Sequence, residues 1–188
     1  MSPKLTLILG GARSGKSTYA EALAQQLAGD EVLYIATAQA LDVEMQDRIA
    51  KHRAQRPAAW PTLETPLHPA RALLAQRPSQ KLLLLDCMTL LVSNILLAHD
   101  NAGEAEVAVR QEIDNLLTAL TTLDAHLIVV SNEVGLGLVP DNALGRAYRD
   151  LLGRANQLLA QAADEVIFMV AGLALPIKGK KGDTPAST

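Results

Sequence analysis

The chain has 188 residues, of which 49% are hydrophobic and 20% are charged, and its formal net charge at pH 7 is −3. This composition is that of a soluble globule with one hydrophobic core, and the small negative charge argues against a nucleic-acid partner. One cysteine, Cys87, excludes an internal disulfide, and no apolar run is long enough for a transmembrane segment, so we expect a cytoplasmic protein.

Short apolar runs alternate with helical patterns along the chain. In chain order the sequence predicts strand 5–9, helix 16–28, strand 32–36, helix 42–56 capped by Asp42, an extended proline-rich loop over 56–69, strand 82–85, helices 88–98 and 104–123, strand 127–130, helix 144–163 and strand 166–170. Apolar strands that alternate with helices are typical of an α/β fold in which helices cover both faces of a mostly parallel sheet. We expect a single domain over 1–178 and a disordered polar tail over 179–188.

The segment between the first strand and the first helix has the spacing of a phosphate-binding loop (P-loop), here called the cradle. It fits Gly, any four residues, Gly-Lys-Ser over residues 10–17. The expected nucleotide contacts are Gly10, Gly11, Ala12, Arg13, Ser14, Gly15, Lys16 and Ser17. Lys16 would reach the β and γ phosphates, and the Ser17 hydroxyl would bind Mg²⁺. The alternative is a glycine-rich turn without a ligand.

A cradle of this kind is paired with an acid at the end of a neighbouring apolar strand. Asp86 ends the run "KLLLLD", so we expect it near Mg²⁺. The alternative is that Asp86 caps the helix that starts near Met88. The chain has no Asn-Lys pair and therefore lacks the guanine-reading motif of Ras-type switches; a small-molecule kinase fits its length best.

A kinase alone leaves the stretch over 36–64 unexplained. On a helix over 42–56, one stripe carries Glu44, Arg48, His52 and Arg56, and Lys51 and Arg53 flank the histidine. The surrounding cations favour a neutral imidazole, which is a nucleophile. The alternative is that His52 lies at the border of the core, one helical turn from Ile49.

Five stretches together resemble the adenosylcobinamide kinase/adenosylcobinamide-phosphate guanylyltransferase family, in order and in spacing. They are "GGARSGKS", "YIATAQALDVEMQDRIAKHRAQRPAAWPTLE", "LLLLDCMTLLVSN", "VSNEVGLGLVPDNALGRAYRDLLGRANQLLAQAADEV" and "GLALPIK", so the resemblance runs from Leu5 to about Lys178. It implies an enzyme of late cobalamin biosynthesis that phosphorylates adenosylcobinamide with ATP or GTP. The enzyme then transfers GMP from GTP through a guanylyl-histidine, giving adenosylcobinamide-GDP and pyrophosphate. A sheet like that of RecA and a homotrimer are also implied.

The resemblance implies roles for further residues. His52 matches the guanylylated histidine, and Thr37 and Arg53 match positions close to the nucleotide. Glu64 is our candidate for reading guanine, with a solvated loop charge as the alternative. Asn132 and Glu133 are candidate contacts to the triphosphate or the corrinoid, with an ordinary strand-to-helix loop as the alternative.

Three questions stay open at this point. Trp60 either stacks on a ligand or pins the proline-rich loop. The chain could instead be a kinase of another small alcohol, without guanylyltransferase activity. It could also be a non-catalytic nucleotide-binding partner of a corrinoid assembly.

Overall fold

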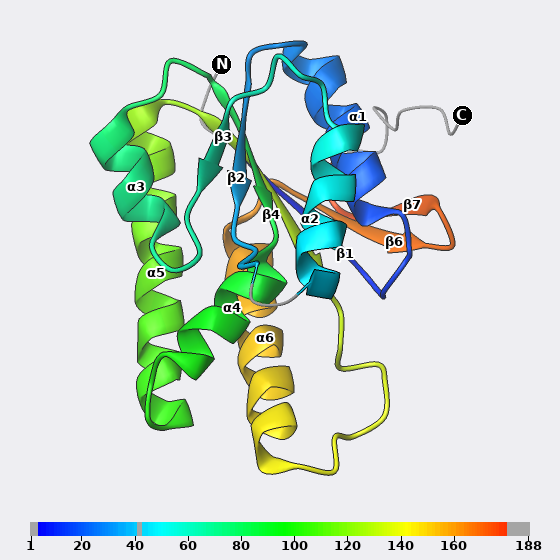
Figure 1. The fold of residues 1–188 in the computed structure, drawn as a ribbon, viewed down its shortest axis with the longest axis vertical. Coiled ribbons are helices and arrows are strands. Elements are labelled where there is room, and N and C mark those ends of the chain that lie inside the picture. Colours follow the sequence, from blue (N-terminus) through cyan, green and yellow to red (C-terminus); the bar gives the residue numbers. More distant parts are fainter. Residues whose placement is uncertain (1–3, 41–42, 180–188) are drawn as a thin grey trace.

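The structure is a computed structural model that describes residues 4–40 and 43–179. The expected cap Asp42 and residues 180–188 of the tail expected over 179–188 lie outside the described residues, as do the side chains of Glu44, Arg48 and Lys51. Within the described part, the carboxyl ends of the central strands point toward the lower side of Figure 1.

Seven strands form one sheet in the order β3-β2-β4-β5-β1-β6-β7, and every neighbouring pair is parallel except β6 and β7. The strands are β1 (Lys4–Gly10), β2 (Val32–Ala36), β3 (Thr62–Glu64), β4 (Leu82–Asp86), β5 (His126–Asn132), β6 (Glu165–Val170) and β7 (Leu173–Lys178). The helices are α1 (Lys16–Ala28), α2 (Val43–Gln55), α3 (Pro69–Gln76), α4 (Met88–Leu97), α5 (Ala102–Leu123) and α6 (Ala143–Ala162). The expected α/β class with a mostly parallel sheet is thus confirmed.

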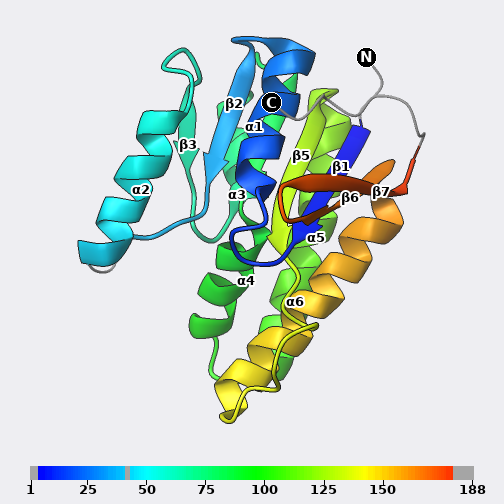
Figure 2. The same cartoon turned by 90° about the vertical axis from the view of Figure 1, so that its right-hand side faces the viewer.

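The two faces of the sheet bury two apolar clusters, because successive strand side chains point to opposite sides. Leu83 and Leu85 of β4 belong to the larger cluster, which packs against helices α3 to α6. Leu82 and Leu84 belong to the smaller cluster, which packs against α1 and Trp60. In Figure 2, α2 forms an outer edge of the molecule, beyond the strands β2 and β3.

The sequence patterns did not predict two strands and one helix of the structure. Each of the three elements contains a proline or adjoins one. The loop expected over 56–69 contains β3, which is an edge strand between Pro61 and Pro66. Pro69 is the first residue of α3, a position that proline favours because its missing N–H would have no helical partner. Pro176 lies within β7, the other edge strand, where proline is tolerated.

Candidate active site

The cradle joins the end of β1 to the start of α1, as its spacing predicted. Gly15 precedes α1 with a φ of 91°, which favours glycine. At Gly10, a Cβ atom would lie 2.5 Å from the carbonyl oxygen of Met169 in β6, so a larger residue does not fit. Lys16 is buried, and its Nζ donates to the carbonyl of Gly11 at 2.6 Å. Burial lowers the pKa of Lys16, an effect that the nearby Cys87 and Asp86 oppose.

Two other loops support the cradle through backbone hydrogen bonds. The N–H of Glu133, which follows β5, donates to the carbonyl of Gly10 at 3.0 Å. The N–H of Gly172, in the β6–β7 turn, donates to the carbonyl of Ser14 at 3.0 Å. The cradle is therefore fixed by strand ends on both sides, and the turn to the unforeseen strand β7 is one of its supports.

Asp86 lies at the carboxyl end of β4, and its side chain does not cap α4. The residue before that helix is Cys87, which makes no side-chain cap hydrogen bond. Instead, Asp86 Oδ2 accepts a hydrogen bond of 2.9 Å from the hydroxyl of Tyr34 in β2. Burial and the carboxylate of Asp86 raise the pKa of Tyr34, so the phenol stays protonated and remains a donor.

Glu21 is a further acid beside the cradle that sequence reasoning missed. It lies one helical turn after Ser17 on α1, on the same side of the helix. Burial and the negative charge of Asp86 raise the pKa of Glu21 to about 7, and Arg56 acts in the opposite direction. The signal available in the sequence was only this four-residue spacing from the cradle serine.

Thr37 does not present its hydroxyl to a ligand. The residue is fully buried, and its Oγ1 donates to the carbonyl of Cys87 at 2.7 Å and accepts from the Cys87 N–H at 3.0 Å. Asn94 of α4, which was not among the expected site residues, donates from Nδ2 to the carbonyls of Thr37 and Pro66, both at 2.9 Å. These bonds join the chain segments that follow β2, β3 and β4.

The structure brings Arg53 of α2 close to Glu64 of β3. Arg53 Nη1 lies 4.0 Å from Glu64 Oε1, and the two side chains are 69% and 72% exposed. A hollow of about 470 Å³ adjoins Glu64, lined by the β3 exit from Glu64 to His68 and by Arg71, Ala72 and Ala75 of α3. The pair is therefore accessible to a ligand.

His52 lies on the last turns of α2 and is half-buried. Its imidazole makes no hydrogen bond with any side chain that the structure describes, while its carbonyl accepts from Arg56 Nε at 3.3 Å.

Trp60 is 5% exposed, and its Nε1 donates to the carbonyl of Gly29 at 2.9 Å. Trp60 thus pins the proline-rich loop to the end of α1, which decides between its two interpretations.

Asn132 and Glu133 lie at the exit of β5. The backbone of Asn132 donates to Thr89 Oγ1 at 2.8 Å and accepts from Asn156 Nδ2 at 3.0 Å. Glu133 Oε1 accepts from the Gly135 N–H at 2.6 Å, which shapes the loop that follows. That loop exposes Leu136 and Leu138 almost completely.

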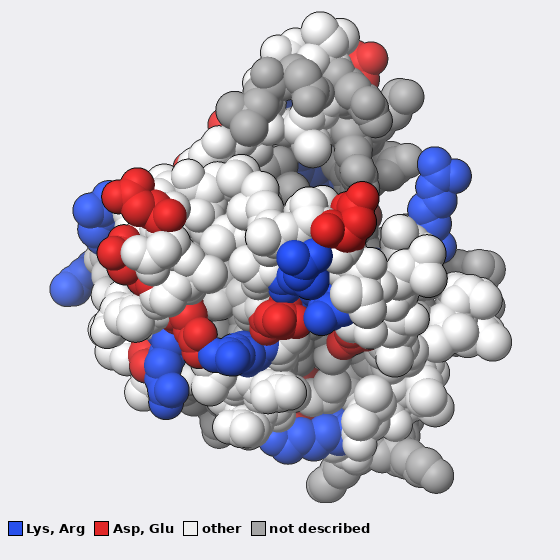
Figure 3. All heavy atoms as spheres, turned by 90° about the horizontal axis from the view of Figure 1, so that it is seen from below, with Lys and Arg blue, Asp and Glu red and all other residues white. Residues whose placement is uncertain are grey.

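Figure 3 shows the molecule from the side at which the central strands end. Lysine and arginine side chains are interspersed with aspartate and glutamate on this face.

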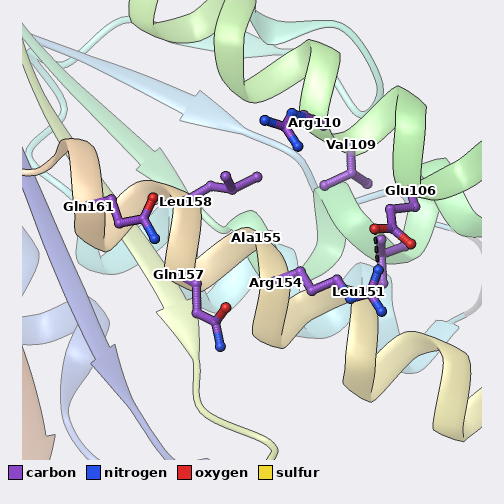
Figure 4. A pocket seen from close by; sticks show the side chains of 9 residues that line it. All are labelled: Glu106, Val109, Arg110, Leu151, Arg154, Ala155, Gln157, Leu158 and Gln161. Atoms are coloured by element: carbon purple, nitrogen blue, oxygen red, sulfur yellow. Dashed lines mark hydrogen bonds and ion pairs between the residues drawn. The ribbon is translucent and has the colours of Figure 1, made fainter.

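A separate groove of about 180 Å³ lies between α5 and α6 (Figure 4), where Glu106 and Arg154 form an ion pair. Its lining residues all come from these two helices, so the groove is not part of the cradle.

The cradle, the helix α1 that follows it and the acid at the end of β4 together define the class of this molecule. It is a P-loop nucleotide-binding protein. The RadB recombinase has a similar fold, with a TM-score of 0.55 at 15% identity over 100% of this chain and 85% of that one. Among the described residues, no helix is long and apolar enough to span a membrane.

Sequence comparison then identifies the family. The family model described as cobinamide kinase / cobinamide phosphate guanyltransferase matches residues 6–177, and the chain belongs to this family. The bifunctional adenosylcobalamin biosynthesis protein CobP of Pseudomonas aeruginosa is 49% identical, over 93% of this chain and 97% of that protein. The bifunctional adenosylcobalamin biosynthesis protein CobU of Salmonella typhimurium is 44% identical, over 93% and 99% of the two chains. The resemblance inferred from the motifs is therefore confirmed.

Proposed function

We propose that this enzyme carries out its two activities, cobinamide kinase and cobinamide phosphate guanylyltransferase, with one triphosphate cradle and one histidine. Family membership supplies the two reactions. The cradle and Asp86 lie at strand ends on the same side of the sheet. Ligands of open parallel sheets bind on this side. The observation that supports a shared site is that Asp86 is linked through Tyr34 and Arg56 to the carbonyl of His52.

In the kinase step, the side-chain hydroxyl of adenosylcobinamide attacks the γ phosphorus of ATP or GTP. The bond to the β-phosphate oxygen breaks, and a nucleoside diphosphate leaves. The backbone N–H groups of the cradle and the Lys16 ammonium hold the phosphates and stabilise their charge in the transition state.

The residues at this site fit a Mg²⁺ ion. Ser17 has no hydrogen-bond partner for its hydroxyl among the described residues, and Tyr34 occupies only one oxygen of the Asp86 carboxylate. Ser17 and Asp86 would hold the ion, which would supply positive charge to the triphosphate when bound.

In the guanylyl step, we assign the nucleophile to His52. Its neutral imidazole nitrogen attacks the α phosphorus of GTP, a P–N bond forms, and pyrophosphate leaves. A phosphate oxygen of adenosylcobinamide phosphate then attacks the same phosphorus and breaks the P–N bond, which gives adenosylcobinamide-GDP and restores the imidazole. Arg53, in the next position on α2, supplies positive charge near the nucleotide.

Guanine recognition is assigned to Glu64. A carboxylate accepts hydrogen bonds from both the N1–H and the exocyclic amine of guanine, and the Glu64 side chain is 72% exposed beside a hollow. Thr37 would contribute indirectly, because its hydrogen bonds hold the ends of β2 and β4 together. The exposed loop that follows Asn132 and Glu133 is our candidate contact for the corrinoid.

Family resemblance also leads us to propose a cytoplasmic homotrimer. The edge strand β7 exposes Leu173, Leu175 and Ile177, all by more than half, on one side of the strand. Burial of such an apolar row against a neighbouring subunit would be favourable.

The decisive experiment is covalent labelling with GTP. The protein should retain label from α-labelled GTP and none from γ-labelled GTP, and the bond should be labile in acid and stable in base, as a phosphoramidate is. His52→Ala should abolish labelling but still phosphorylate adenosylcobinamide, because Lys16, Ser17 and Asp86 are unchanged. Undiminished α label on the His52→Ala protein would contradict the assignment, as would guanylyl transfer at the normal rate without a covalent species.

A further inference from the structure

Arg56 follows the last residue of α2 and has no role in the reactions above. Its Nε donates to the carbonyl of His52 at 3.3 Å, and its Nη1 donates to Thr62 Oγ1 of β3 at 3.4 Å. A cation at this end of a helix satisfies a carbonyl that has no partner within the helix, and it interacts favourably with the helix dipole. One side chain therefore joins the turn that carries His52 to the edge of the sheet.

The same guanidinium lies over an aromatic ring inside the sheet. Arg56 Cζ is 3.8 Å from the centroid of the Tyr34 ring, a short cation–π distance. Tyr34 is 4% exposed, and its hydroxyl donates to Asp86 Oδ2 at 2.9 Å. The ring is buried and its hydroxyl is held by a part-buried hydrogen bond, so it is a fixed surface on which the guanidinium of Arg56 rests.

The local charges favour this position of Arg56. The carboxyl groups of Asp86 and Glu21 interact electrostatically with Tyr34, and Arg56 opposes both on that phenol. Arg56 also lowers the pKa of Glu21 against the effects of burial and Asp86. The guanidinium thus interacts favourably with the carboxyl group of Glu21 on α1 and offsets the effect of Asp86 on Tyr34 and on Glu21.

We infer that Arg56, seated on Tyr34, is a positioning residue for His52, and that the contacts from Asp86 through Tyr34 and Arg56 to the His52 carbonyl set the histidine turn relative to the cradle. This inference rests on the roles proposed for His52 and Asp86. It predicts that loss of Arg56 impairs guanylylation through the rate of the chemical step rather than through GTP binding. It also predicts that phosphorylation, which does not use His52, is spared.

The test measures two reactions of the full-length protein in parallel. One is the rate of GMP-protein formation over a range of α-labelled GTP concentrations, and the other is phosphorylation of adenosylcobinamide. For Arg56→Gln we expect the maximal labelling rate to fall by about ten- to hundredfold, as misplacement of a reacting group by about 1 Å can cause, with kinase turnover within about threefold of the wild type. Arg110→Gln, which changes an exposed arginine on α5, is the matched control and should leave both rates unchanged.

Variants of Tyr34 separate its ring from its hydroxyl. Tyr34→Leu removes the ring under Arg56 and should reduce labelling as Arg56→Gln does. Tyr34→Phe keeps the ring but loses the hydrogen bond to Asp86, so it should reduce labelling by a smaller factor. Combining Arg56→Gln with Tyr34→Leu should cost little more than either change alone, because both remove the same contact.

Three results would overturn the inference. The first is labelling of Arg56→Gln at the wild-type maximal rate. The second is recovery of that rate at high GTP, which would make Arg56 a nucleotide ligand. The third is an equal loss of both reactions together with a lowered melting temperature, which would make it merely structural.

A readout that does not depend on His52 chemistry keeps the two hypotheses distinguishable. If the wild type forms no GMP-protein, the proposed role of His52 fails, and amide hydrogen exchange over residues 49–55 then decides the present inference. Exchange in Arg56→Gln should be faster than in Arg110→Gln, because the carbonyl anchor of this turn is lost. Equal exchange in the two variants would contradict the inference.

Discussion

The helices α1 and α2 each carry a proposed catalytic residue and each follow a parallel strand, but they are held in different ways. Helix α1 buries Ala20, Leu23 and Ala24 in the smaller apolar cluster, and the cradle before it is bonded by backbone groups of two other loops. The contacts of this region with the sheet include the pair of Arg53 with Glu64 and, just beyond the end of α2, those of Arg56 with Thr62 and with the ring of Tyr34. Val43, at the start of α2, is 72% exposed.

Under the proposed assignment of Lys16 and His52, the two activities depend on different kinds of stabilisation. Lys16 is placed by buried apolar surface and by backbone geometry, which single side-chain changes elsewhere on the surface leave intact. The turn of His52 is held in part by the side chain of Arg56, through its hydrogen bond to the His52 carbonyl and its contact with Tyr34. Substitutions near α2 should therefore separate guanylyl transfer from phosphorylation, whereas substitutions in the cradle should affect both.

The largest expected effect is that of Lys16→Ala, which tests the cradle side of the comparison. Both reactions should lose on the order of a hundredfold or more in turnover, because a preorganised charge on the triphosphate is removed. Steady-state kinase assays and GMP labelling of the same preparation measure this. Lys81→Ala is a matched control, since Lys81 Nζ also donates to a backbone carbonyl, that of Leu123, but on the exposed surface. Near-normal kinase turnover of Lys16→Ala would refute the cradle assignment.

An intermediate effect is expected for Glu64→Ala, which tests the region around α2, because Glu64 of β3 lies beside Arg53 of that helix. If Glu64 reads guanine, kcat/KM for GMP labelling should fall about ten- to hundredfold, the worth of a hydrogen bond to a charged group. The preference for GTP over ITP, which lacks the exocyclic amine, should fall as well. The free energy of unfolding should change by less than about 0.5 kcal/mol because the side chain is exposed. Glu31→Ala, which changes another exposed glutamate, is the control. If Glu64→Ala keeps the same preference for GTP as this control, Glu64 does not read guanine and is only a solvated charge.

The smallest expected effect concerns Glu21, which lies between the two regions. Its pKa in the folded protein is about 7, above the ordinary value of 4.5, so the folded state binds the proton more tightly than the unfolded state. The stability that this proton provides is fully present below about pH 4.5 and is lost as the pH rises through about 7. Solvent screening of the partly exposed group reduces the effect to roughly 1 kcal/mol.

Denaturant titrations from pH 5 to pH 8 measure this dependence. The free energy of unfolding of the wild type, minus that of Glu21→Gln, should decrease over this range. A difference that stays constant with pH would mean that Glu21 titrates near its ordinary value in the folded protein.

Sequence patterns predicted most of the fold because the relevant signals are local. The bounds expected for α1 and β2 agree with the structure, since a glycine-rich turn and an uninterrupted apolar run are read from adjacent residues. The sequence did not predict the edge strands β3 and β7, because β3 has only three residues and β7 contains a proline. Their extended conformation depends on pairing with the neighbouring strands of the sheet, which is not a local property of the sequence. The cradle and Asp86 were located for the same local reason. Asn94, Tyr34 and Arg56 lie within the quoted stretches, but nothing in the spacing of these stretches gave the three residues a role.

The P-loop, the parallel-sheet class and the family could be recognised from the amino-acid sequence, because glycine spacing, apolar periodicity and the order of motifs are properties of the linear chain. The connection from Asp86 to the turn of His52 could not be recognised before the chain was folded. Tyr34 and Asp86 are 52 positions apart in the chain, and their hydrogen bond exists because β2 and β4 are neighbours in the sheet. Such contacts depend on the packing of whole elements, in which no single residue type or spacing specifies the partner, so they become visible only when the chain is folded.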